Sequence, residues 1–222
     1  MEDFDTIFWH FSMICVSFFN CLWWCFLYFT RDTECAYLSF IYTVVCAYRS
    51  IFPRVDLERN VLIDNSLSSI FLGRSCATIA EICFAIQISN FFSCNIVYII
   101  TLAQMFCWLS VLTLNPFWHI IEESLWMFSA CYIGISNINH LPYTILYVAY
   151  MMIEDIPMYI QKYREWDGRY LHITEGLRNS IYVRNKKVSW SYWRGEAIWM
   201  SLYFSVGVLF SNYMMIKKTY NI

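Results

Sequence analysis

The sequence has few charged residues and few of the motifs that mark a soluble enzyme. Charged residues make up 14% of the 222 positions and hydrophobic residues 59%, whereas soluble domains carry about 25% charged and about 45 to 50% apolar residues. The formal net charge of −2 excludes a basic nucleic-acid-binding protein, and the apolar content excludes a disordered chain. The composition therefore predicts a polytopic membrane protein of the all-α class.

Catalytic and cofactor motifs are also missing from the sequence. There is no Gly-rich phosphate loop, nucleophile elbow or Ser-His-Asp arrangement, so the sequence leaves catalytic residues and cofactors unknown. The last hydrophobic run has neither an internal lysine for a retinal Schiff base nor a histidine for a zinc hydrolase site. The N-terminus carries Glu2, Asp3 and Asp5 instead of a basic region, so we expect the first hydrophobic segment to be retained.

Ten cysteines are present, and most of them lie within apolar runs. A cysteine in such a run behaves as a small hydrophobic residue. The spacing of Cys21 and Cys25 lacks a second pair of ligands, so the sequence predicts no metal site.

Seven hydrophobic segments are long enough to predict transmembrane helices of about 20 residues. We expect a single transmembrane domain over 1–222, a bundle of about seven spans with one basic, aromatic extramembrane loop. The spans are predicted at 7–29, 36–52, 67–89, 94–114, 117–138, 141–161 and 196–216.

Lysine and arginine concentrate in segments that seven spans place on one side of the membrane. The loop 53–66 and the segment 162–195 hold most of the basic residues, whereas the other side has Arg31, Lys217 and Lys218. Because cytoplasmic loops keep the excess of positive residues, we predict a cytoplasmic N-terminus and a C-terminus on the opposite side.

The segment 162–195 mixes these basic residues with tyrosines and tryptophans. Such a mixture is typical of a membrane interface, so we predict an interfacial cytoplasmic loop in contact with lipid. A specific site for an anionic lipid headgroup or a partner is the alternative. Alternation from Ser180 to Trp190 predicts a small hairpin within it. No nucleic-acid motif is present, so nucleic acid is not an expected partner.

Several ionisable residues lie within or at the ends of the predicted spans. Each costs about 2.5 to 3.5 kcal/mol in hydrocarbon and therefore requires a partner or water. We take them as candidate ligand- or ion-binding residues: Arg49, Arg74, Glu81, His119, Glu122, Glu123, Glu154 and Asp155.

The topology predicts that these groups form a polar funnel open to the cytoplasm. Arg74 and the carboxylates of the fifth and sixth spans fall at a similar depth, with Arg49 just above them. Glu81 lies about 10 Å deeper than Arg74 along the third span, because a helix rises about 1.5 Å per residue. Arg74, Thr78 and Glu81 share one helical face. The adjacent stripe consists of small residues that favour close helix packing, Gly73, Ala77 and Ala80.

Two further features accompany the predicted funnel. His119 lies one helical turn from Glu122 and Glu123, a spacing that fits tuned protonation or part of a metal or proton-transfer site, with an interfacial histidine as the alternative. Pro157 follows Asp155 and removes one backbone hydrogen bond, which predicts a kink suited either to ion coordination and gating or to a static bend.

Three functions remain open from the sequence. The leading hypothesis is a transporter or channel for a cation, a proton or a small solute, with Glu81 as the deep site and Arg74 as the competing counter-charge. The second is a lipid-modifying enzyme, with carboxylates as acid and base and an arginine for an anionic headgroup. The third is a membrane scaffold or assembly factor, whose internal charges specify helix pairing. Expected partners are the lipid bilayer, cations and anionic headgroups, with oligomerisation left open.

Overall fold

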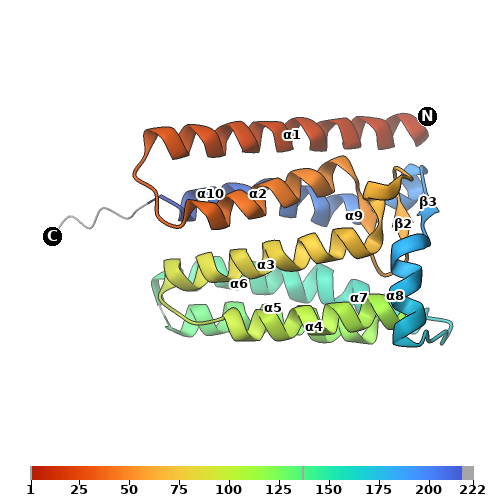
Figure 1. Cartoon of the computed structure of the whole chain (residues 1–222). Helices are drawn as coiled ribbons and strands as arrows, with labels where there is room; N and C mark the ends of the chain where they lie inside the picture. The colour runs from red at the N-terminus through yellow and green to blue at the C-terminus, as the bar shows by residue number, and fades with distance from the viewer. Residues whose placement is uncertain (1, 137, 217–222) are drawn as a thin grey trace. The chain divides into compact units, whose positions relative to one another are not determined.

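The computed structural model describes residues 2–136 and 138–216, and most of them lie in helices (Figure 1). Each hydrophobic segment predicted above is helical, with bounds close to those expected. Lys217 and Lys218, which the orientation prediction uses, lie outside the described residues, as does residue 137 of the fifth predicted span. The first five helices are α1 (Glu2–Thr30), α2 (Ala36–Ile51), α3 (Ile70–Phe92), α4 (Val97–Thr113) and α5 (Phe117–Ser136).

The sixth and seventh predicted spans are each interrupted by a π-helical segment. The sixth consists of α6 (Leu141–Tyr150), the π-helical η3 (Met151–Asp155) and α7 (Ile156–Arg164). The seventh consists of α9 (Trp190–Leu202), the π-helical η4 (Tyr203–Gly207) and α10 (Val208–Met214). The kink predicted around Pro157 therefore coincides with a π-helical turn, directly before the proline, in which the N–H of Ile156 donates to the carbonyl of Met151.

Three helices are long and apolar enough to cross a membrane: Asp3–Thr30, Ile70–Phe92 and Trp190–Met214. They indicate a membrane protein, and the predicted all-α class is confirmed. Helices α2 and α4 are apolar but have only 16 and 17 residues, short for a hydrocarbon core of about 30 Å at about 1.5 Å per residue. The number of about seven spans is thus not confirmed and stays a prediction.

The chain forms two compact units. Unit 1 comprises Met1–Val55, Arg59–Gln87 and Arg184–Ile222, and unit 2 comprises Asp56–Glu58 and Ile88–Val183. The expectation of a single transmembrane domain over 1–222 stays a prediction.

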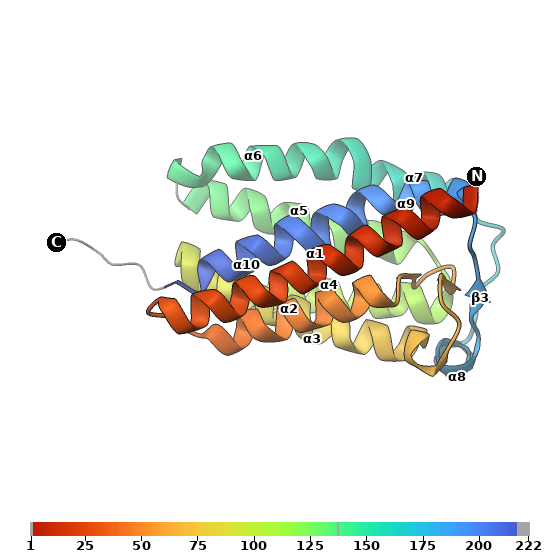
Figure 2. The same ribbon diagram turned by 90° about the horizontal axis from the view of Figure 1, so that it is seen from above.

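Unit 1 is built around long helices with an aromatic core. Helices α1, α2, α9 and α10 pack beside one another, as Figures 1 and 2 both show. Trp9 of α1 stacks on Trp193 of α9 with 5.7 Å between ring centroids, and Tyr42 of α2 stacks on Phe84 of α3 at 4.5 Å. Gly207 allows this packing, because a Cβ atom there would lie 3.0 Å from the Tyr42 hydroxyl. The core of unit 1 therefore consists largely of aromatic rings, and one of them, Tyr42, packs against a glycine.

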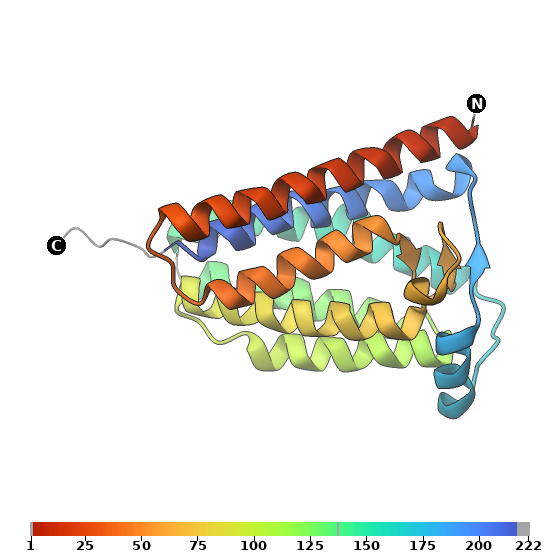
Figure 3. The ribbon, with the colours of Figure 1, turned by 45° about the horizontal axis from the view of Figure 1, so that its top comes forward.

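A small three-stranded sheet closes the end of unit 1 at which α1 begins (Figure 3). Strand β1 (Arg54–Val55) pairs antiparallel with β2 (Asn60–Val61), and β2 pairs parallel with β3 (Asn185–Lys186). The predicted hairpin over Ser180–Trp190 is therefore wrong. The strand that it should contain pairs with a distant one, because the Asn185 and Lys187 N–H groups donate to the carbonyls of Arg59 and Val61 at 2.8 and 2.9 Å.

In unit 2, α4 packs against α5, α5 against α6 and α7, and α8 (Ile173–Tyr182) against α4. Gly176 of α8 lies so close to α4 that an added Cβ atom would come within 1.8 Å of the Leu112 carbonyl oxygen. The Lys162 ammonium also lies 3.0 Å from the Glu58 carboxylate. The segment 162–195, expected as one interfacial loop, instead contains a helix, a strand and the start of α9.

Candidate functional site

The predicted site residues fall into both units. Arg49, Arg74 and Glu81 belong to unit 1, and the remaining candidates, on α5 and η3, belong to unit 2. The funnel that would join them stays a prediction.

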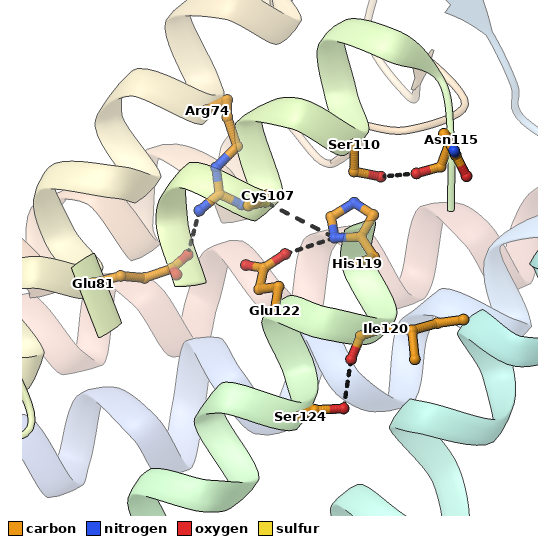
Figure 4. A network of polar contacts seen from close by, with 9 residues as sticks. All are labelled: Arg74, Glu81, Cys107, Ser110, Asn115, His119, Ile120, Glu122 and Ser124. Carbon is orange, nitrogen blue, oxygen red and sulfur yellow. Dashed lines mark hydrogen bonds and ion pairs between the residues drawn. The ribbon is translucent and has the colours of Figure 1, made fainter. Parts of the chain in front are cut away.

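In unit 1, Arg74 and Glu81 form a buried ion pair within α3. The Arg74 Nη2 atom donates to Glu81 Oε1 at 2.9 Å, and the two side chains are only 6% and 8% exposed. Figure 4 shows the guanidinium and the carboxylate facing each other along the helix. The spacing i, i+7 puts both residues on one face two turns apart, and the length of the arginine side chain closes the gap. The shared face expected from the sequence is correct for this pair.

Gly73, next to Arg74, has a different role from the one predicted. A Cβ atom at Gly73 would come within 1.7 Å of the guanidinium carbon of Arg54. Arg54 is almost fully buried, lies 4.8 Å from the ring centroid of Tyr48, and donates to the Ser69 carbonyl at 3.1 Å. The glycine therefore makes room for an arginine that the sequence had assigned only to a cytoplasmic loop.

Arg49 lies near a π-helical turn of unit 1. Its guanidinium carbon is 5.4 Å from the ring centroid of Phe204, which belongs to η4, and the arginine is buried at the end of α2. Tyr203, the neighbour of Phe204, has its ring centroid 5.7 Å from that of Tyr42. The guanidinium thus lies over the face of an aromatic ring that belongs to a π-helical turn. Turns of this kind recur at functional sites in proteins.

Unit 1 also contains a buried network of hydrogen bonds between uncharged groups, which was not predicted from the sequence. The hydroxyls of Ser39 and Thr43 donate to Asn212 Oδ1 at 2.7 and 3.0 Å, and the Ser211 hydroxyl donates to Gln87 Oε1 at 2.6 Å. Asn212 Nδ2 in turn donates to the carbonyl of residue 20 on α1 at 3.4 Å. Amides and hydroxyls inside otherwise apolar helices were the available signal, since such groups commonly bond across helices.

In unit 2, His119, Glu122 and Cys107 meet in a buried cluster (Figure 4). His119 Nδ1 lies 2.6 Å from Glu122 Oε2 and 3.9 Å from Cys107 Sγ, and the three ligand atoms lie within 4.8 Å of one another. The histidine ring also stacks on Tyr159 with 4.6 Å between ring centroids. The predicted contact between His119 and Glu122 is therefore confirmed. Cys107 was missed because it lies on another helix, in a run that reads only as apolar.

The other carboxylates of unit 2 do not belong to this cluster of three ligands. Glu123 is partly buried beside Glu122, whereas Glu154, in η3, is exposed and Asp155 is partly buried. Their role as a vestibule stays a prediction.

No protein-family model matches this chain, and neither does any curated protein or any solved structure.

Proposed function

We propose that this chain is a multi-pass membrane transporter or channel in which Glu81 binds a proton or another cation in exchange with Arg74. The observation that carries the proposal is the buried 2.9 Å ion pair between Arg74 and Glu81 inside α3, one of the helices able to cross a membrane. An ionisable group in such a helix is by default a functional-site hypothesis, because it costs about 2.5 to 3.5 kcal/mol in hydrocarbon.

The pair lies within α3, so the guanidinium that a bound cation would displace is held 2.9 Å from the carboxylate by one helix. A cation that binds Glu81 in place of the guanidinium takes this counter-charge away from Arg74. Differential binding of this kind shifts a conformational equilibrium, and η4, with Phe204 against Arg49, is an irregular turn in the same unit that can respond.

We also propose seven spans with a cytoplasmic N-terminus and the C-terminus on the opposite side. The pairing of β2 with β3 supports the expectation that the segments 53–66 and 162–195 share one side, because hydrogen-bonded strands of one sheet lie together. The Asp64 carboxylate accepts from Arg184 Nε at 2.8 Å between the same two segments. Cysteine labelling from each side of a sealed vesicle tests this topology, and opposite accessibility of these segments would overturn it.

Flux measurements on purified protein in liposomes test the transport proposal. Protons and monovalent cations are offered in turn to the wild type and to Glu81→Gln, with folding verified by size-exclusion chromatography. Glu175→Gln is the matched control, because Glu175 is exposed on α8. We expect wild-type and control protein to conduct at least one ion and Glu81→Gln to conduct none. Absence of flux in folded wild-type protein, or equal flux in Glu81→Gln, contradicts the proposal.

A lipid-modifying enzyme is the second candidate, because a buried imidazole bonded to a carboxylate at 2.6 Å is a suitable acid–base group. In that case His119 transfers the proton and Glu122 fixes the ring. Product formation from a labelled lipid, lost in His119→Gln and kept in the exposed control His172→Gln, supports this candidate. A folded wild type that turns over no lipid in a panel of headgroups rejects it.

A further inference from the structure

We infer that Cys107, His119 and Glu122 of unit 2 form a binding site for a divalent transition-metal ion of the zinc class. The sulfur, nitrogen and oxygen atoms of these side chains lie within 4.8 Å of one another, and all three residues are buried. The inference goes beyond the transport proposal, because it concerns other residues and a different ligand.

The local structure brings the three ligands together from two helices. His119 and Glu122 share one face of α5 at a spacing of i, i+3, and Cys107 comes from α4, which packs against α5. The turn between these helices is held by its own hydrogen bonds: the Ser110 hydroxyl donates to the Asn115 carbonyl at 2.8 Å, and the Phe117 N–H donates to Asn115 Oδ1 at 3.0 Å. The site is therefore organised by the helix hairpin.

The distances are close to those of a tetrahedral metal centre. Zinc bonds of 2.0 to 2.3 Å to sulfur, nitrogen and oxygen put neighbouring ligand atoms about 3.5 Å apart. The observed separations from His119 Nδ1 are 3.9 Å to the sulfur and 2.6 Å to the carboxylate oxygen. Binding thus requires the carboxylate to turn away from the ring by about 1 Å, a change that side-chain torsions of the glutamate provide.

The charges of the three ligands also suit a dication. A thiolate and a carboxylate together neutralise Zn²⁺, so the complex carries no net charge in the buried site that Cys107, His119 and Glu122 provide. Three protein ligands leave one position open for water or an exogenous ligand, as in catalytic zinc sites. Stacking on Tyr159 fixes the ring plane of His119, so the imidazole is oriented before the metal arrives.

A nucleophilic triad of cysteine, histidine and glutamate is the competing interpretation. In such a triad the thiol uses one ring nitrogen and the carboxylate uses the other. Here the thiol of Cys107 and the carboxylate of Glu122 both approach Nδ1 of His119. Convergence on one nitrogen atom fits shared coordination and does not fit a relay through the ring.

Cobalt binding to the full chain tests the site. Purified protein is stripped of metal in detergent and titrated with Co²⁺, which reports a thiolate ligand through its near-ultraviolet charge-transfer band. We expect one Co²⁺ per folded chain, displaced by Zn²⁺. Cys107→Ser should abolish the charge-transfer band and weaken binding about tenfold or more. The matched control is Cys131→Ser, which removes another cysteine of unit 2, on α5. A folded wild type that binds no Co²⁺, or a full band in Cys107→Ser, overturns the inference.

A second measurement does not depend on the folding of any variant. X-ray absorption at the zinc edge of the loaded wild-type protein should give one sulfur and two protein nitrogen or oxygen donors, and a shell without sulfur overturns the inference. Neither the cobalt titration nor the X-ray absorption experiment measures flux. Both therefore test the metal site whether or not the transport proposal is correct.

Discussion

Unit 1 contains two buried polar groups that differ in charge, a neutral hydrogen-bond network and an ion pair. The neutral network connects α2, α3 and α10 through side chains and reaches a backbone carbonyl of α1. The 2.9 Å contact between Arg74 and Glu81 stays within α3. Hydrogen bonds between helices stabilise their packing, whereas a buried ion pair keeps two charges in a span where each is costly to desolvate. We therefore propose a structural role for the network and ion binding for the pair.

The largest expected effect comes from removing one charge of the pair. Arg74→Leu takes away the 2.9 Å counter-charge of Glu81, and we expect the free energy of unfolding to fall by about 3 kcal/mol, because a buried charge loses its partner. Reversible unfolding in mixed micelles measures this. The control Arg178→Leu changes an exposed arginine of α8 and should stay within about 0.5 kcal/mol. Equal stabilities of the two variants would contradict an energetic coupling between Arg74 and Glu81.

A change in the neutral network should cost somewhat less. Asn212→Ala removes the acceptor of the Ser39 and Thr43 hydroxyls, and we expect a loss of about 2 kcal/mol in the same unfolding assay. The folded fraction should keep its flux, because this network is assigned to structure. The exposed Asn90→Ala is the matched control. Flux lost in folded Asn212→Ala would break the proposed division of roles.

Gly73 allows the packing around the pair to be tested apart from its charges. In Gly73→Ala the new Cβ atom meets the Arg54 guanidinium at 1.7 Å, so we expect a loss of about 1.5 kcal/mol from overpacking. Gly195→Ala is the control, because no atom lies within 4 Å of its added Cβ, and the better helix propensity of alanine should leave stability unchanged or raised. Thermal unfolding of both variants decides this, and a stabilised Gly73→Ala would show that Arg54 can move away.

The smallest expected loss of stability is that of the double variant Arg74→Leu/Glu81→Leu. Replacing both members of a buried ion pair by well-packed apolar residues is often neutral or stabilising by about 1 to 4 kcal/mol. The double variant should therefore be more stable than Arg74→Leu alone, which sharpens the distinction between stability and function. A double variant less stable than either single variant would assign the pair to structure.

Features that depend on one helix were predictable from the sequence. Long apolar runs fix the positions of helices, and the spacing of His119 and Glu122 or of Arg74 and Glu81 fixes which groups share a face. Both pairs are in contact in the structure.

Features that depend on a distant partner could not be predicted in the same way. The pairing of strand β3 has no local signal, because its hydrogen-bond partners lie in β2, more than a hundred residues earlier. Cys107 reads as one more apolar residue until the turn between α4 and α5 brings it to His119. The burial of Arg54 depends on a glycine in another element, which composition does not reveal.

The most direct test of the transport proposal is ion flux through liposomes containing the double variant Arg74→Leu/Glu81→Leu beside the wild type. The variant lacks the ion pair of α3 but should fold with nearly wild-type stability, so a loss of flux cannot be attributed to unfolding. We expect conduction by the wild type and none by the double variant. Flux at the wild-type rate in the double variant would contradict the proposed role of the ion pair.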